Sequence, residues 1–151
     1  MARVRVQRED IDVAAEIAAL SAGRPEIGAV VTFSGLCRDE DGTLSALELE
    51  HYPGMAEAEI ARICAEAMNR FDLIDACAIH RFGRILPGET IVLVAAASRH
   101  RHAAFDGASF IMDFLKTGAP FWKKEHGIDD TPGGWVSARD ADDSARDRWS
   151  R

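Results

Sequence analysis

The sequence predicts a single α+β domain in which mixed and antiparallel strands alternate with two to three packed helices. Three observations lead to this prediction. Stretches rich in β-branched residues recur along the chain, segments with apolar residues at helical spacing lie between them, and Gly or Pro separates the two kinds of segment. The chain has 151 residues, of which 47% are hydrophobic and 28% charged, which is typical of one globular domain.

The first third of the chain is expected to form a strand, a helix and a pair of strands. Residues 3–7 alternate in polarity, and Asp10 offers an N-cap to a helix over 11–21. The segment 28–37 is rich in β-branched residues, which favours a buried strand. The segment 44–52 alternates apolar and polar residues, and a polar turn joins the two strands. We therefore expect them to pair as a hairpin.

The rest of the domain is expected to contain two helices and two long strands. Residues 55–71 carry an apolar stripe at helical spacing, and residues 103–117 carry another. The segments 74–85 and 90–98 read as strands, the second being apolar enough for the centre of a sheet. A short extended piece, 121–125, follows the last helix.

The C-terminal part of the chain differs in composition from the rest. Gly133 and Gly134 precede Trp135 and Val136, which could form a last strand. From Ser137 onward the residues are almost all polar or charged. We therefore expect one domain over residues 1–136, followed by a polar and flexible tail over 137–151.

The charge balance and the cysteines exclude several classes of protein. The chain has 25 acidic and 18 basic side chains, a formal net charge of −7, which argues against a general nucleic-acid binder. Neither an apolar signal region nor a membrane-spanning stretch is evident, so a cytoplasmic protein is expected. Cys37, Cys64 and Cys77 are far apart and form no CxxC pair, so we expect buried thiols rather than a zinc site.

Histidines do not indicate a metal site either. His100 and His102 have no carboxylate at ligand spacing, and the sequence contains no HExxH motif. His51 and His80 lie within expected strands, where a hydrogen-bonded histidine of the core or sheet edge is the more common case. The residues therefore predict neither a metal nor a cofactor.

Positive charge gathers in residues 99–102 (RHRH), at the expected start of a helix. A helix N-terminus attracts anions and disfavours cations. Four basic side chains at that end therefore indicate an anion, such as a phosphate, that offsets them. A solvated surface turn explains the same residues equally well, and the sequence pattern leaves both interpretations open.

Two further groups of cations flank apolar segments. Lys116 lies at a helix C-terminus, where its charge is favourable, and Lys123 lies beside the aromatic pair Phe121 and Trp122. If the two lysines converge, each makes it harder for the other to hold a proton, and a partly neutral lysine can act as a nucleophile or a general acid–base. Arg38 follows a buried strand and could bind a phosphate through its guanidinium group. Ordinary solvated side chains remain the alternative for all three.

Five strings carry a family resemblance, and they run in order through most of the chain. They are GAVVTFSGLCRD (28–39), LELEHYPGMAE (47–57), IHRFGRILPGE (79–89), SRHR (98–101) and FIMDFLKTGAPFWKKE (110–125). These strings closely resemble the large, catalytic subunit family of molybdopterin synthase. The resemblance implies an α/β hammerhead-type fold and a sulfurtransferase activity in molybdenum cofactor biosynthesis.

The resemblance also implies partners and a substrate. The family forms a homodimer within a heterotetramer, together with a small ubiquitin-like sulfur-carrier subunit whose C-terminal Gly-Gly bears a thiocarboxylate. The substrate of the family is cyclic pyranopterin monophosphate, which receives two sulfurs to give the dithiolene of molybdopterin. No cofactor and no metal is implied.

Carried over position by position, the resemblance assigns five residues. Lys116 and Lys123 match the two catalytic lysines, and Lys116 is the residue expected to contribute most. Arg38, His100 and Arg101 match positions that bind the substrate. In the family the pocket draws residues from both subunits of the dimer, so His100 and Arg101 are expected to serve the neighbouring chain's site.

Two more positions match residues near the pocket, and two depart from the pattern. Phe33 and Met112 are expected to line the pocket, although both could be core residues. Leu36 and Cys37 stand where a basic or polar residue followed by an aliphatic one is expected, which weakens the positive field near Arg38. A sulfur relay through Cys37 is a minor hypothesis, because the carrier already supplies the sulfur.

Other functions remain as alternatives at this stage. A non-catalytic module that only holds the carrier or a phosphate would lack a catalytic lysine, and here both lysines are present. A different enzyme could form a Schiff base between Lys116 and a phosphorylated carbonyl compound. A purely structural role gives no reason for the set of Arg38, His100, Lys116 and Lys123.

Overall fold

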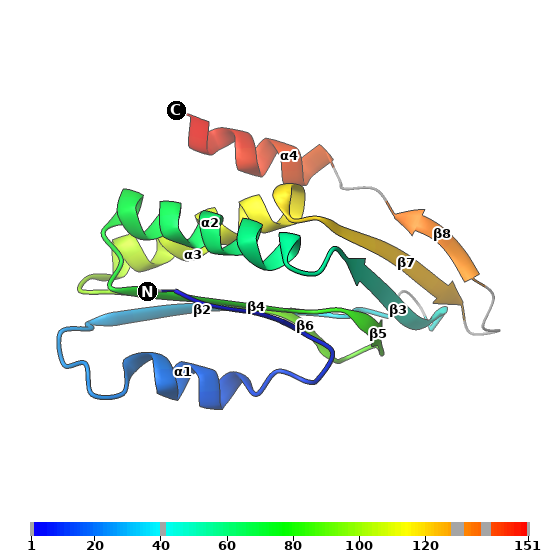
Figure 1. The fold of residues 1–151 in the computed structure, drawn as a ribbon, viewed down its shortest axis with the longest axis horizontal. Helices are drawn as coiled ribbons and strands as arrows, with labels where there is room; N and C mark the ends of the chain where they lie inside the picture. Colours follow the sequence, from blue (N-terminus) through cyan, green and yellow to red (C-terminus); the bar gives the residue numbers. More distant parts are fainter. Residues whose placement is uncertain (1, 40–41, 128–131, 137–139, 151) are drawn as a thin grey trace.

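The computed structural model describes residues 2–39, 42–127, 132–136 and 140–150 (Figure 1). Their elements are β1 (Arg3–Gln7), α1 (Val13–Ser21), β2 (Ala29–Leu36), β3 (Leu44–His51), α2 (Met55–Phe71), β4 (Asp75–Arg81), β5 (Gly83–Ile85), β6 (Thr90–Ser98), α3 (Arg101–Gly118), β7 (Phe121–Gly127), β8 (Pro132–Val136), α4 (Asp140–Asp147) and the 3₁₀ turn η1 (Arg148–Ser150). None of the helices in these residues is long and apolar enough to cross a membrane.

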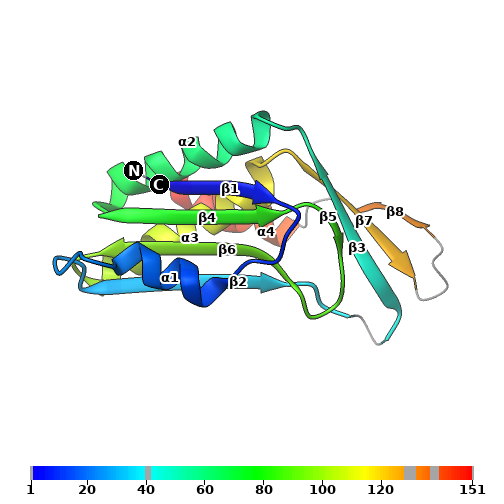
Figure 2. The same cartoon turned by 60° about the horizontal axis from the view of Figure 1, so that its bottom comes forward.

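The described strands form two four-stranded sheets. Sheet A has the order β1-β4-β6-β2, with β1 parallel to β4 and the other pairs antiparallel. Sheet B has the order β5-β3-β7-β8 and is antiparallel throughout. Helix α1 covers one face of sheet A, and α2 and α3 cover the other, while sheet B lies across the end of sheet A (Figures 1 and 2). The prediction of an α+β fold with mixed and antiparallel strands and packed helices is confirmed.

Strand β6 is the centre of the core because both of its faces are covered. Val92, Val94 and Ala96 belong to the apolar cluster beneath α2 and α3, whereas Leu93 and Ala95 belong to the cluster beneath α1. Side chains alternate along a strand, so one strand can supply two cores. This explains the uninterrupted apolar run that the sequence shows over β6.

The predicted hairpin of the segments 28–37 and 44–52 does not form. Strand β2 pairs with β6 at the edge of sheet A, whereas β3 pairs with β5 and β7 in sheet B. The polar turn between the two strands thus carries the chain from one sheet to the other. Alternation in the sequence fixes which face of a strand is buried, but it does not select the partner strand.

The single strand predicted over 74–85 is divided in two. Gly83 has a φ of 85° and separates β4 of sheet A from β5 of sheet B. That backbone region favours glycine, because a Cβ atom is strained there. Phe82 N donates a hydrogen bond of 3.0 Å to the carbonyl of Gln7, which fixes the bend against the end of β1.

The C-terminal segment, whose polarity predicted a flexible tail, contains a helix and a 3₁₀ turn that contact α3. Residues 140–150 form α4 and η1, while 137–139 and 151 lie outside the described residues. Trp149 provides the physical reason. Its Nε1 donates a hydrogen bond of 2.7 Å to Asp113 on α3, and its ring packs edge-on against Phe71 and Phe110, with centroids 5.4 and 5.6 Å away.

Gly28 should be essential for the junction between β2 and β6. A Cβ atom on Gly28 would lie 2.2 Å from the backbone oxygen of Arg99, so Gly28→Ala must push the two strands apart. We expect a loss of about 2 kcal/mol in the free energy of unfolding, measured by urea denaturation. Gly118→Ala is the matched control, because its Cβ would meet only Glu59 Oε1 at 3.8 Å. An equal, small effect of both changes would contradict this account.

Candidate active site

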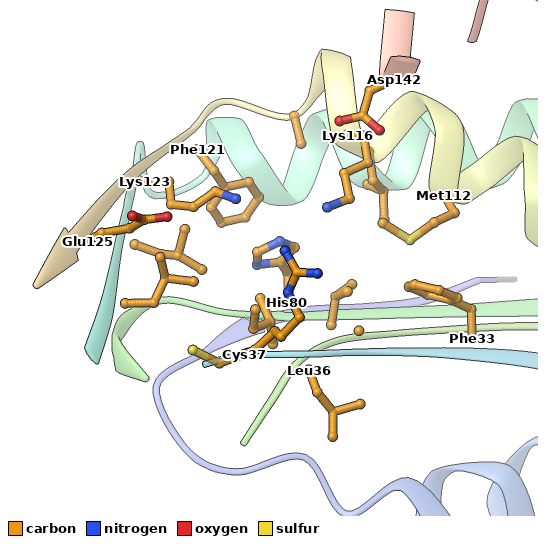
Figure 3. A pocket seen from close by; sticks show the side chains of 18 of the residues that line it. Phe33, Leu36, Cys37, His80, Met112, Lys116, Phe121, Lys123, Glu125 and Asp142 are labelled. Atoms are coloured by element: carbon orange, nitrogen blue, oxygen red, sulfur yellow. The ribbon is translucent and has the colours of Figure 1, made fainter. Parts of the chain in front are cut away.

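A cavity of about 400 Å³ opens where the C-terminal end of α3 passes over the junction of the two sheets (Figure 3). Its lining comes from the end of β2, from β3, β4, β6, α3 and β7, and from one residue of α4. The apolar part includes Leu47, Leu49 and Leu115. The polar and charged lining residues are Arg38, His80, Lys116, Lys123, Glu125 and Asp142. A mostly apolar hollow with a few polar groups is typical of a small-molecule site.

The two lysines converge in this cavity. Lys116 lies in the last turn of α3 and Lys123 is the third residue of β7, and their ammonium groups point toward each other across the pocket (Figure 3). The connection between α3 and β7 consists of Ala119 and Pro120 alone. Lys123 faces the cavity and Lys124 is not part of its lining, as expected for neighbours in a strand. Two cations in one cavity create a field that favours an anion.

Arg38 adds a third cation from the opposite wall of the cavity. It follows β2, and it lines the pocket together with its neighbour Cys37. The charge of the pocket is partly balanced by Glu125 from β7 and Asp142 from α4. The structure therefore brings together Arg38, Lys116 and Lys123, three of the residues that the sequence singled out.

Phe33 and Met112 also line the pocket, on the side away from sheet B (Figure 3). Phe33 lies on the edge strand β2 and is 41% exposed, which is high for a large apolar side chain. Met112 lies one helical turn before Lys116 on α3, so the two side chains share a helix face. Both side chains could offer an apolar surface to a planar ring.

His100 and Arg101 are not part of this pocket within one chain. They lie at the N-terminal end of α3, and His100 is the residue that precedes its first turn. Lys116 lies fifteen positions after Arg101 in the helix, roughly 22 Å along its axis. His100 makes no side-chain capping hydrogen bond to the helix. Within one chain, these two residues therefore lie at the opposite end of α3 from the pocket.

The three thiols are buried and carry raised pKa values. Burial, followed by the charge of Glu89, raises the pKa of Cys37, against the opposing effect of Lys123. Burial raises the pKa of Cys64 to about 12 and that of Cys77 to about 11. A thiol, rather than a thiolate, is a weak nucleophile. The chemistry of Cys37 thus gives no support to a sulfur relay.

His80 is a pocket residue that the sequence interpretation assigned to a core or sheet edge. Burial lowers the pKa of its imidazole to about 4, against the opposing effect of its hydrogen bond to Arg81, and the charge of Lys116 lowers the pKa further. The ring is therefore neutral at physiological pH. The sequence contained one indication that His80 faces the helices. It follows Ala76 and Ala78 at alternate positions of β4, and those two residues lie in the core beneath α2 and α3. Nothing in the sequence indicated Asp142, which reaches the pocket only because α4 packs on α3.

Potential metal ligands do not cluster in the part of the chain that the structure describes. No three His, Cys, Asp or Glu side chains there are arranged to hold a metal ion. The groups around the cavity instead suit an organic anion, with cations on two walls and an apolar surface between them.

Comparison with known proteins identifies the family. The model of the MoaE protein family matches residues 6–118, about three quarters of the chain. The chain belongs to the MoaE family. Among curated proteins, the molybdopterin synthase catalytic subunit of Rhizobium meliloti (strain 1021) is 74% identical over 148 residues, which cover 98% of this chain and 96% of that protein.

Solved structures of the MoaE family share the fold. The molybdopterin biosynthesis MoaE protein from Burkholderia ambifaria MC40-6 has a TM-score of 0.86 and 49% identity, and the match covers 100% of this chain and 99% of that one. A complex of subunits 1 and 2 of the molybdopterin-converting factor from Helicobacter pylori 26695 has a TM-score of 0.74 and 19% identity, covering 86% and 88%. At that identity the second likeness shows the fold alone.

The family model and the relatives cover the site residues differently. Lys116 and Arg38 lie within the matched residues 6–118, whereas Lys123 lies five residues beyond them. The alignment with the Rhizobium meliloti protein covers 98% of this chain, a share that extends well past the end of the family model. The resemblance seen in the sequence is thus confirmed at the level of the family.

The pKa of His80 should make the stability of the MoaE-family fold depend on pH. An unfolded histidine binds a proton near pH 6.5 and His80 in the fold only near pH 4, so the unfolded chain takes up the proton first as the pH falls. Stability should therefore decrease by roughly 2 kcal/mol between about pH 7 and pH 4.5 through this group. Urea denaturation at both pH values would measure it. His80→Phe should lose less of its free energy of unfolding over the same pH range, because it lacks the titrating imidazole. An identical pH dependence of the wild-type protein and His80→Phe would contradict this role of His80.

Proposed function

We propose that this chain is the catalytic subunit of a molybdopterin synthase, a cytoplasmic sulfurtransferase of molybdenum cofactor biosynthesis. The observation that carries the proposal is the convergence of Lys116, Lys123 and Arg38 in one cavity of a MoaE-family chain. The 74% identity to a molybdopterin synthase catalytic subunit supports the same conclusion. The ammonium groups of the two lysines point toward each other across the cavity, which suits both charge stabilisation and proton transfer (Figure 3).

The substrate in this proposal is cyclic pyranopterin monophosphate. Its phosphate is an anion, and the guanidinium of Arg38 offers the planar pair of donors that a phosphate prefers. The pterin ring is flat and partly apolar, so it would lie against Phe33 and Met112 on the side wall. An acidic protein with a net charge of −7 binds such an anion only where cations are concentrated, as they are here.

The sulfur donor in this proposal is a small ubiquitin-like carrier protein. Its C-terminal Gly-Gly thiocarboxylate would enter the cavity, where Lys116 and Lys123 attract the negative tail. The curated relative with 74% identity is named as a catalytic subunit, which supports a second kind of chain in the assembly. Two carrier subunits and two copies of the present chain would form a heterotetramer.

The chemistry assigns separate tasks to the thiocarboxylate and the lysines. The sulfur of the thiocarboxylate attacks an electrophilic carbon of the substrate, and a carbon–oxygen bond at that carbon breaks. The oxygen leaves with a proton, and the substrate is then linked through the sulfur to the carrier's acyl group. Water then cleaves the acyl–sulfur bond, so that the sulfur stays on the substrate and the carrier leaves as a carboxylate. Lys116 donates a proton, or stabilises the negative charge that develops, and Lys123 supports the same charge. A second carrier repeats the sequence to complete the dithiolene.

Lys116→Ala should abolish most of the synthase activity. With thiocarboxylated carrier and cyclic pyranopterin monophosphate, we expect the rate of molybdopterin formation to fall by roughly 10²–10³-fold, because both proton transfer and charge stabilisation are lost. Lys123→Ala should have a smaller effect of the same kind. Lys124→Ala is the matched control, since Lys124 is not part of the cavity lining.

Two results of this reconstitution would argue against the proposal. A wild-type rate from Lys116→Ala would remove that residue from the mechanism. Carrier binding without product from the wild-type protein would favour a non-catalytic module. Trapping of a substrate adduct on Lys116 by borohydride would instead favour a Schiff-base enzyme.

His100 and Arg101 should complete the pocket of the neighbouring chain in a homodimer. This assignment explains why two anion-binding residues lie at the far end of α3 from Lys116. In a dimer related by a two-fold axis, the N-terminal end of α3 in each chain can approach the pocket of the other. Phe33, exposed on the edge strand β2, would then be covered in part by the second chain.

Mixed dimers can test this contribution in trans. Lys116→Ala and Arg101→Ala should each be nearly inactive alone. After unfolding and refolding together, their mixture should recover about a quarter of the wild-type activity, because half of the dimers are mixed and each mixed dimer has one intact site. If Arg101 serves its own chain's pocket, no activity should return. Rates of molybdopterin formation before and after mixing decide between the two.

A further inference from the structure

His80 occupies an unusual place in the sheet beneath the two lysines. It follows Ala76 and Ala78 along β4, on the face covered by α2 and α3, and its partners in the neighbouring strands are Val6 and Val92. A polar ring in an apolar row needs hydrogen-bond partners for both nitrogens, or access to water for the one that lacks a partner.

One nitrogen of the His80 ring is fixed by the backbone. Nδ1 lies 2.8 Å from the carbonyl oxygen of Arg81. A carbonyl oxygen can only accept a hydrogen bond, so in a neutral ring Nδ1 carries the proton and Nε2 carries the lone pair. The ring also stacks on Phe121, with centroids 3.9 Å apart and planes inclined by 19°. The hydrogen bond to the Arg81 carbonyl and the stacking on Phe121 together hold the His80 ring in one orientation.

The other nitrogen, Nε2, is open to the pocket. It makes no hydrogen bond to any residue that the structure describes. No fully buried side-chain nitrogen or oxygen in that part of the chain lacks a partner, so Nε2 is accessible to solvent. The ring lines the cavity and lies on its floor beneath the Lys116 and Lys123 ammonium groups (Figure 3).

We propose that His80 is a positioning residue of the active site. Its unprotonated Nε2, which has no partner among the described residues, accepts a hydrogen bond from the Lys116 ammonium when that flexible side chain turns toward it, and so sets where the ammonium meets the substrate. The proposal rests on the function proposed above for this pocket. Lys116 is a long, flexible side chain, and an acceptor fixed by the sheet restricts it to one of its many conformations.

The groups around His80 keep its ring neutral, and only a neutral ring can accept a hydrogen bond through Nε2. The charged and titratable groups that face it are Lys116 on α3, Lys123 on β7 and His51 on β3, and a proton on any of them disfavours a proton on His80. Burial acts in the same direction, and the pKa of about 4 leaves the His80 ring neutral at physiological pH. The ring beneath the two ammonium groups thus keeps a lone pair available (Figure 3).

The stack with Phe121 extends the effect of His80 to the second lysine. Phe121 is the first residue of β7, two positions before Lys123, and it follows α3 after two residues. The His80 ring therefore supports the segment that joins the two lysines. A single side chain on the rigid sheet can in this way fix the relative place of Lys116 and Lys123.

Two variants separate the lone pair from the stack. His80→Phe keeps an aromatic ring against Phe121 and removes the acceptor, whereas His80→Gln keeps an acceptor and loses the stack. We expect His80→Phe to lower kcat by roughly ten- to a hundredfold, the effect of losing one hydrogen bond to a charged group, with little change in KM for the carrier. His80→Gln should recover a large part of kcat. A wild-type kcat in His80→Phe overturns the proposal.

NMR spectroscopy can test the hydrogen bond between His80 and Lys116 without measuring enzyme activity. In the wild-type protein with ¹⁵N-labelled histidine, long-range NMR correlations should show His80 protonated on Nδ1 and not on Nε2 at neutral pH. The Nε2 signal should shift in Lys116→Ala, and it should not shift in Lys124→Ala. A proton on Nε2, or no shift in Lys116→Ala, overturns the proposal.

These measurements also separate the failure of the two proposals. If the wild-type protein makes no molybdopterin, the proposed function fails, while the tautomer of His80 and its response to Lys116→Ala still report the hydrogen bond. If His80→Phe does not fold, as its thermal melting would reveal, the NMR comparison on the intact His80 ring decides alone.

Discussion

The geometry of the candidate active site depends on the short connection between α3 and β7. Only Ala119 and Pro120 separate the last turn of the helix from the first residue of the strand. The helix lies on sheet A and the strand belongs to sheet B, so this connection joins the two layers at a fixed angle. A longer loop would let Lys116 and Lys123 move apart, whereas the observed one holds both over the same cavity.

The positive charges of the pocket are partly balanced by carboxylates. Three cations face the cavity from three different elements, and Glu125 and Asp142 lie on its border. Like charges held close together repel each other, and water screens them poorly inside a cavity. The neutral ring of His80 provides an acceptor on the floor without adding a further charge. An anionic substrate entering such a site replaces repulsion between cations with attraction.

Sequence reasoning predicted the α+β class and the helices because hydrophobic periodicity depends on local spacing. It paired β2 with β3, which the structure contradicts, because strand pairing depends on contacts that are distant in the sequence. It also missed the bend at Gly83, whose need for a positive φ arises from the change of sheet. The helix and turn of residues 140–150 were not predicted because the segment is polar, although Trp149 within it packs against the core.

The candidate site was predicted from the sequence only in part. Physical reasoning found the cationic segments, but it left their convergence open, and the family resemblance selected Lys116, Lys123 and Arg38. The tertiary structure brings those three into one cavity, whereas His100 and Arg101 lie at the other end of α3, a separation that the length of the predicted helix already implied. His80 was passed over because a single histidine in a strand has many structural explanations, and only its place beneath the lysines distinguishes it.

The burial of all three cysteines has a consequence for selectivity. Activated sulfur and acyl groups exchange readily with any accessible thiolate, so a reactive cysteine beside the pocket could divert the donor into an unproductive adduct. Cys37 lies in the pocket wall, yet it is 3% exposed and its raised pKa keeps it protonated. Cys64 and Cys77 are deeper still within the core. In the proposed reaction, the burial of the cysteines would keep the protein's own sulfur atoms from exchanging with the donor.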